Sequence, residues 1–88
     1  MTFDLHTTSD FDRALRKLAK KNPEFRKAIE KKTLQILKNP FRFKPMHSPL
    51  QGFRRVHLMK SFVLLYQVDE KKKAVVLVRL EHHDSVYK

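Results

Sequence analysis

The sequence predicts an α+β fold in which a helical hairpin packs on one face of a mostly antiparallel four-stranded sheet. Two segments with apolar residues at helical spacing fill residues 9–39, and three apolar segments typical of strands follow them. One short alternating segment precedes the helices. Helices that come before a run of strands favour an α+β arrangement over a doubly wound parallel sheet. The expected order is therefore β-α-α-β-β-β, in one domain that spans residues 1–88.

Residues 2–7 predict the first strand, because apolar and polar side chains alternate along them. Ser9 is expected to be the N-cap of the first helix, and Asp12 three positions later completes a capping box. The helix then turns one apolar stripe towards the core, made of Phe11, Ala14, Leu15 and Leu18.

The Asn22-Pro23 pair predicts the end of the first helix and the start of a second, since Asn caps a helix and Pro suits its first position. Asn39-Pro40 predicts where this second helix ends. Its apolar stripe comprises Phe25, Ala28, Ile29, Thr33, Ile36 and Leu37. The basic residues on its other face are interpreted as a solvated helix surface.

Residues 40–52 hold three of the four prolines and the sole glycine, which indicates an ordered loop anchored on the core by Phe41, Phe43 and Leu50. Strands are expected at residues 53–58, 62–68 and 74–80. In the first of these, Arg55 and His57 share the face opposite Val56 and Leu58. In the last strand, Ala74, Val76, Val78 and Leu80 are expected on one face and Val75, Leu77, Arg79 and Glu81 on the other.

Charge is the strongest compositional signal, because 20 Lys and Arg against 9 acids give a formal net charge of +11. Nucleic acid is the partner that suits this charge best, and an acidic protein or a merely solvated basic surface are the alternatives. The chain has no cysteine, so it offers neither disulfides nor thiolate metal ligands. The first ten residues carry acids and no apolar run, and no stretch approaches a membrane span. We expect a cytoplasmic location.

Ionisable groups that could carry chemistry lie in three places: His47 in the loop, Arg55 and His57 on one strand, and Arg79, His82 and His83 at the end of another. If the three strands pair as expected, Arg55, His57 and Arg79 face one groove. Histidine exchanges protons near neutral pH and arginine matches phosphate geometry, so the combination suits cleavage of a phosphodiester.

In RNA, one histidine would take the proton of the 2′-hydroxyl, which attacks the adjacent phosphorus, and another group would protonate the leaving 5′-oxygen. Arg79, helped by Arg55 or Arg54, would stabilise the charge on the phosphate oxygens, and Tyr87 could stack on a base or donate its hydroxyl. This chemistry needs neither a cofactor nor a metal. A metal site of His82, His83 and Asp84 is a competing idea, which is disfavoured because adjacent side chains in an extended segment point apart.

Several motifs in this order are typical of one family: Leu50, Gly52, Phe53 and Arg54 at the strand entry, the apolar run LLYQVD, and His82, His83, Val86 and Tyr87 at the close. Over essentially the whole chain the sequence resembles the RelE/ParE superfamily of toxins from toxin–antitoxin modules. The histidines are most similar to those of the YafQ branch, whose members are ribosome-dependent endoribonucleases that cut mRNA in the decoding site.

This resemblance implies a RelE-like fold, an antitoxin partner, the ribosome with bound mRNA as target, and catalytic roles for His47, His57, His83, Arg79 and Tyr87. RNA contacts are expected from Arg54, Arg55, Lys60, Ser61 and His82. Two departures stand out, because Ser61 replaces a functional aspartate of the YafQ branch and Val63 replaces an arginine of classical RelE members. The alternatives are a ParE-like inhibitor that binds DNA gyrase without nuclease chemistry, and an inactive member that still binds an antitoxin.

Overall fold

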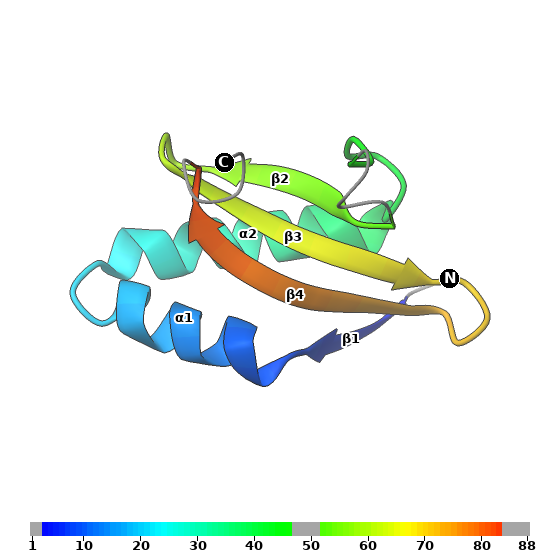
Figure 1. Cartoon of the computed structure of the whole chain (residues 1–88), viewed down its shortest axis with the longest axis horizontal. Coiled ribbons are helices and arrows are strands. Elements are labelled where there is room, and N and C mark those ends of the chain that lie inside the picture. Colours follow the sequence, from blue (N-terminus) through cyan, green and yellow to red (C-terminus); the bar gives the residue numbers. More distant parts are fainter. Residues whose placement is uncertain (1–2, 47–51, 84–88) are drawn as a thin grey trace.

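The structure, a computed structural model, describes residues 3–46 and 52–83 (Figure 1). Its elements are β1 (Asp4–Thr7), α1 (Ser9–Ala19), α2 (Pro23–Lys38), β2 (Arg54–Leu58), β3 (Phe62–Asp69) and β4 (Ala74–His82). The predicted order of elements is confirmed. The predictions for His47, Leu50 and Tyr87 concern positions outside the described residues. Within the described ranges, no helix is long and apolar enough to cross a membrane.

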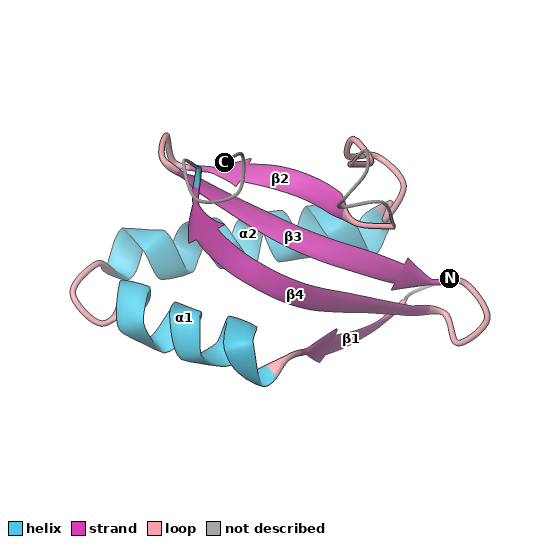
Figure 2. Cartoon of the chain, viewed as in Figure 1, coloured by secondary structure: helices cyan, strands magenta, loops and turns pink. Residues whose placement is uncertain are grey.

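The four strands form one mixed sheet in the order β1-β4-β3-β2 (Figure 2). β1 runs parallel to β4, while β4, β3 and β2 are joined by antiparallel pairing. In Figure 1, α2 passes behind β2 and β3, and α1 lies along β4 beyond the end of β1. Both helices contribute to a single apolar core on one face of the sheet, which confirms the predicted α+β architecture.

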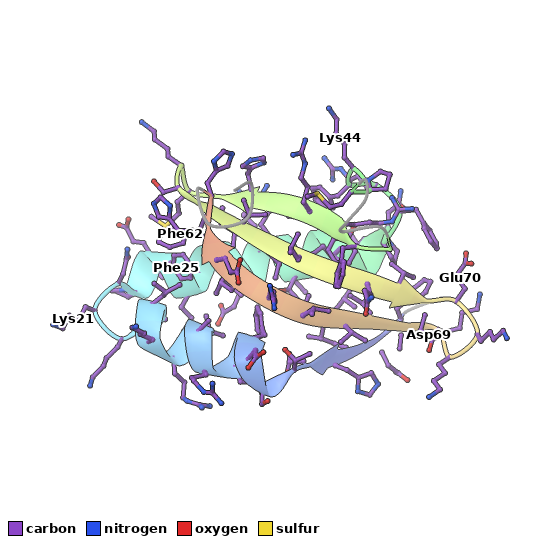
Figure 3. All side chains as sticks on the ribbon, in the orientation of Figure 1. Lys21, Phe25, Lys44, Phe62, Asp69 and Glu70 are labelled. Atoms are coloured by element: carbon purple, nitrogen blue, oxygen red, sulfur yellow. The ribbon has the colours of Figure 1, made fainter. Side chains whose placement is uncertain are left out.

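The second helix begins as predicted, with the side chain of Asn22 accepting a hydrogen bond from the backbone N–H of Phe25 at 3.2 Å. Phe25 is buried and packs edge-to-face against Phe62 of β3, with ring centroids 5.1 Å apart (Figure 3). Aromatic pairs in this geometry add stability beyond the area they bury. The contact therefore fixes the start of α2 against the central strand.

The first helix is capped one residue earlier than predicted, by Thr8 and not by Ser9. The Thr8 hydroxyl accepts from the backbone N–H of Phe11 at 3.0 Å and donates to the carbonyl of Val78 at 2.6 Å. β1 pairs with β4 only as far as Thr7, so the Val78 carbonyl lies beyond the reach of that ladder. Thr8 satisfies both the helix end and this carbonyl, which explains why it serves as the cap.

A β-bulge interrupts the alternation predicted for β4. Leu65 of β3 pairs with Arg79, whereas the next residue, Tyr66, pairs with Leu77, so Val78 is an extra residue on β4. A bulge of this kind changes which side chains share a face of the strand.

The bulge moves Leu80 to the helix-covered face, where it joins the core with Val75 and Leu77. The prediction that Leu80 shares a face with Ala74 and Val76 is therefore wrong. Arg79 and Glu81 lie on the opposite face of the sheet. Alternation alone could not reveal this change, because it follows from the register between two strands.

Replacing Thr8 by Val should lower the free energy of unfolding by about 2 kcal/mol, because the helix cap and the bond to Val78 are both lost. Urea denaturation measures the loss. Thr8→Ser keeps the hydroxyl and is the matched control, expected to stay within about 0.5 kcal/mol of the wild type. Equal losses in the two variants would show that the hydroxyl is not the stabilising group.

Candidate catalytic site on the open face of the sheet

The face of the sheet opposite the helices, which we call the open face, carries two cross-strand rows of side chains. The strand register aligns Arg55, Leu65 and Arg79 in one row, and His57, Val63 and Glu81 in the next. Arg55, His57 and Arg79 therefore occupy one face, as the predicted strand pairing requires.

The middle of this face is apolar. Val63 and Leu65 of β3 are 0% and 2% exposed, and each lies between charged or ionisable residues of β2 and β4. Electrostatic interactions strengthen where water is excluded and the local dielectric is low. The polar groups along the sides of this apolar floor, however, remain in contact with water, since His57 is exposed and the Arg79 side chain is half-exposed.

Two histidines meet at the end of this face. The rings of His57 and His83 have centroids 5.4 Å apart with planes inclined by 32°. His83 follows β4, and its backbone N–H donates to the Ser61 carbonyl in the β2–β3 turn at 2.6 Å. This bond fixes the end of β4 beside the turn, so the two imidazoles are neighbours although 26 positions separate them in the sequence.

The surroundings of His57 favour its neutral form. Desolvation, followed by the positive charges of Arg55 and His83, lowers the pKa of His57 below its usual 6.5. A neutral imidazole at physiological pH can accept a proton. A positive charge on His83 therefore disfavours the imidazolium form of His57.

Arg79 lies on β4, across β3 from Arg55. Its guanidinium pairs with Glu81 at 3.5 Å, and its side chain is 53% exposed. Together with Arg13 and Lys17 of α1 it lines a hollow of 250 Å³. Since Arg55 and Arg79 are two strands apart, their backbones are separated by roughly 10 Å. The two arginines therefore border the site from opposite sides.

Arg54 holds the loop that follows α2. Its guanidinium donates to the carbonyls of Phe43 at 2.7 Å and Phe41 at 3.4 Å, and lies 5.3 Å from the centre of the Phe41 ring. The Tyr66 hydroxyl donates to the carbonyl of Pro40 at 2.6 Å, and burial raises the pKa of Tyr66 to about 12. These contacts indicate a structural role for Arg54 in the loop, and its contact with RNA stays a prediction.

The remaining predicted residues surround the histidine pair. Lys60 and Ser61 are exposed in the β2–β3 turn, next to His83. The His82 ring packs edge-on against Phe62 at 5.5 Å, away from the contact of His83 with His57. The adjacent histidines thus point apart. Residues 3–46 and 52–83 contain no group of three His, Cys, Asp or Glu side chains that could hold a metal ion.

Sequence reasoning missed one cationic feature beside His57. A hollow of 430 Å³, which we call the β2-edge hollow, is lined by Lys32, Arg42, Phe43, Lys44, Arg55, Val56 and His57. Sequence patterns alone place Lys32 among the basic residues of a solvated helix surface. A signal was nevertheless present, since the chain contains no acidic residue between Glu30 and Asp69.

Comparison with known proteins shows the family to which the chain belongs. Residues 5–87 match the family described as the ParE toxin of type II toxin–antitoxin system, parDE. The chain belongs to this toxin family. A protein of Methanocaldococcus jannaschii named as a RelE4 toxin is 42% identical over 86 residues, which cover 98% of this chain and 92% of the relative.

Solved structures of toxins share the fold. The toxin–antitoxin complex RelBE2 from Mycobacterium tuberculosis contains a chain with a TM-score of 0.79 and 25% identity, covering 94% of this chain and 100% of its own. YafQ from Escherichia coli has a TM-score of 0.78 at 17% identity, covering 98% of this chain and 99% of its own. The predicted membership of the RelE/ParE superfamily is confirmed.

We expect the His57 imidazole to titrate below 6.5 in the wild-type protein, and to titrate at higher pH in the Arg55→Gln variant. The positive charge of Arg55 disfavours the imidazolium, so its removal raises the pKa of His57, while the larger effect of desolvation persists. Histidine ring resonances followed by NMR across pH 4–9 measure the change. Lys71→Gln, in the turn at the other end of β3, removes the same charge and should leave the titration of His57 unchanged.

Proposed function

We propose that this toxin is an endoribonuclease that cleaves mRNA on the ribosome and thereby stops translation. The observation that carries the proposal is the contact between His57 and His83, 5.4 Å apart, at one end of the open face. Arg55 borders the pair, and Arg79 lies across the apolar floor. Two imidazoles with neighbouring guanidinium groups can supply a base, an acid and phosphate contacts without a metal.

His57 is the proposed general base, because its lowered pKa keeps it neutral at physiological pH. It would remove the proton of the 2′-hydroxyl, and the resulting oxygen would attack the adjacent phosphorus. As the bond from phosphorus to the 5′-oxygen breaks, His83 would give that oxygen a proton. The products are a 2′,3′-cyclic phosphate and a free 5′-hydroxyl.

The arginines have a separate proposed role. Negative charge spreads over the non-bridging phosphate oxygens during attack, and fixed positive groups stabilise it. Arg55 is on the same strand as His57, and Arg79 approaches from β4. The ion pair with Glu81 orients Arg79 before the substrate arrives. The predicted contributions of His47 and Tyr87 to catalysis remain part of this proposal.

The proposed target and partner follow from family resemblance. The histidine pattern resembles that of the YafQ branch, whose members cut mRNA in the ribosomal decoding site. The Mycobacterium tuberculosis relative is seen in a toxin–antitoxin complex, and we propose that this chain likewise binds a cognate antitoxin. A net charge of +11 suits both ribosomal RNA and an acidic protein segment. Translated mRNA would place the toxin in the cytoplasm.

A second candidate function is inhibition of DNA gyrase by binding. The description of the matching family, ParE toxin of parDE, favours it. Such an inhibitor needs no proton-transfer groups, so the neighbouring imidazoles of His57 and His83 would have no role in it. An inactive toxin that only binds its antitoxin is the third alternative.

An in vitro translation reaction with primer extension tests these alternatives. The His57→Ala and His83→Ala variants should each cleave translated mRNA on the order of 10²- to 10⁴-fold more slowly than the wild type, because each lacks one proton-transfer group. His6→Ala is the matched control, since His6 lies on β1 at the opposite edge of the sheet from β2. Its cleavage should equal that of the wild type.

Intact mRNA with the wild-type protein would refute the nuclease proposal. Gyrase poisoning in a supercoiling assay, together with intact mRNA, would establish the second candidate. Absence of both activities would leave an inactive antitoxin-binding member.

A further inference from the structure

The basic charge of this chain is concentrated in one continuous stretch of sequence. All nine acidic residues lie outside residues 31–68, at or before Glu30 and at or after Asp69. Within that stretch the cations are Lys31, Lys32, Lys38, Arg42, Lys44, Arg54, Arg55 and Lys60. The stretch comprises the second half of α2, the following loop, β2 and most of β3. These elements bring many of its cations to one edge of the sheet.

The β2-edge hollow is where four of these cations meet. Lys32 comes from α2, Arg42 and Lys44 from the loop, and Arg55 from β2. Figure 3 shows Lys44 projecting outward on the β2 side of the sheet, whereas Asp69 and Glu70 lie at the β3–β4 turn. No carboxylate is among the described residues that line the hollow.

The loop that forms the wall of the hollow is held by backbone hydrogen bonds. The N–H of Arg55 donates to the Lys44 carbonyl at 3.1 Å, and the N–H of Met46 donates to the Phe53 carbonyl at 2.8 Å. Arg54 also donates to the Phe43 carbonyl. A fixed loop loses little conformational entropy when a ligand binds.

An aromatic ring holds two of the cations in place. Phe43 packs edge-on against the buried Tyr66, with ring centroids 6.5 Å apart. The ammonium of Lys32 lies 6.0 Å from the centre of the Phe43 ring, and the guanidinium of Arg42 lies 5.6 Å from it. Contacts of this kind orient a cation without neutralising its charge. The hollow therefore keeps its positive potential.

These features favour an anionic ligand. Across residues 3–46 and 52–83, Lys32, Arg42 and Lys44 make no ion pair with a carboxylate. Bringing like charges together costs free energy because they repel each other. A bound polyanion offsets this repulsion, because it attracts each of the cations. A volume of 430 Å³ compares with about 15 Å³ for a site that holds one water molecule, so a phosphate and its sugar can enter.

We propose that the β2-edge hollow binds the sugar-phosphate backbone of RNA next to the bond that is cleaved. This inference rests on the proposed nuclease function and extends it to the substrate beyond the cleaved bond. Arg55 and His57 belong both to the hollow and to the candidate catalytic site. A strand whose phosphate lies at His57 therefore continues directly into the hollow. The contacts are with phosphate, so the hollow binds RNA without reading its sequence.

The affinity for a short 2′-O-methyl RNA tests the proposal, because this probe cannot be cleaved. The hollow variant carries Lys32→Gln, Arg42→Gln and Lys44→Gln together. For a single strand, each phosphate contact contributes about 0.7 to the slope of log Kobs against log salt concentration. The hollow variant should therefore lose about 2 from the magnitude of this slope.

A charge-matched control carries Lys20→Gln, Lys21→Gln and Lys71→Gln, three exposed positions in the two turns away from the hollow. It should keep the wild-type slope. Equal slopes in the hollow and control variants would overturn the proposal, and so would a wild-type protein that does not bind the probe at low salt. Urea denaturation should show equal midpoints for both variants, which separates binding from folding.

Three further outcomes identify which of the two proposals is wrong. In the first, the hollow variant cleaves mRNA on the ribosome at the wild-type rate and keeps the wild-type slope of log Kobs against log salt concentration. This result would refute the present inference and leave the nuclease function intact. A second outcome is that poly-glutamate binds the wild type and binds the hollow variant more weakly, while RNA binding is unchanged. This result would assign the hollow to an acidic polypeptide and overturn the RNA proposal. A wild type that leaves mRNA uncut would refute the nuclease function itself.

Discussion

The pairing of β3 with both of its neighbours is the constraint on which the rest of the structure depends. Residues 63–66 of this strand are fully or almost fully buried, and the strand carries no charged side chain before Asp69. Such a strand is stable only when both of its edges are hydrogen-bonded and both of its faces are shielded from water. β2 and β4 supply the hydrogen bonds, and their pairing with β3 sets the position of every polar group on the open face.

The bulge at Val78 and the side chain of Thr8 allow β4 to pair with β3 while it meets two requirements. The strand must present Leu80 to the core and also present Arg79 and Glu81 to the open face. One extra residue accomplishes both, because it reverses the alternation after Leu77. The Thr8 hydroxyl bonds the Val78 carbonyl at this position and caps α1 with the same oxygen. The start of the first helix and the direction of Arg79 are therefore linked.

The distribution of charge over the molecule follows the order of the strands in the sheet. β2 lies at one edge of the sheet, and the stretch without acids includes this edge and the half of α2 that leads to the loop. Two kinds of contact hold this region together without carboxylates. Phe43 packs against Tyr66, and the Arg54 guanidinium donates hydrogen bonds to loop carbonyls. Stability here comes from aromatic packing and hydrogen bonds, so the positive charge remains available for a polyanion.

The sequence by itself determined the order of the elements, the second helix cap at Asn22, the apolar central strand and the family, because each depends on local patterns or motifs. It also indicated that Arg55 and His57 share a face, since alternation within one strand is local. Only the tertiary structure decided that His57 meets His83 and that Lys32 joins Arg42 and Lys44. The cap at Thr8 and the bulge at Val78 also required it. These features depend on register and on contacts between distant segments, which periodicity along a single segment does not encode.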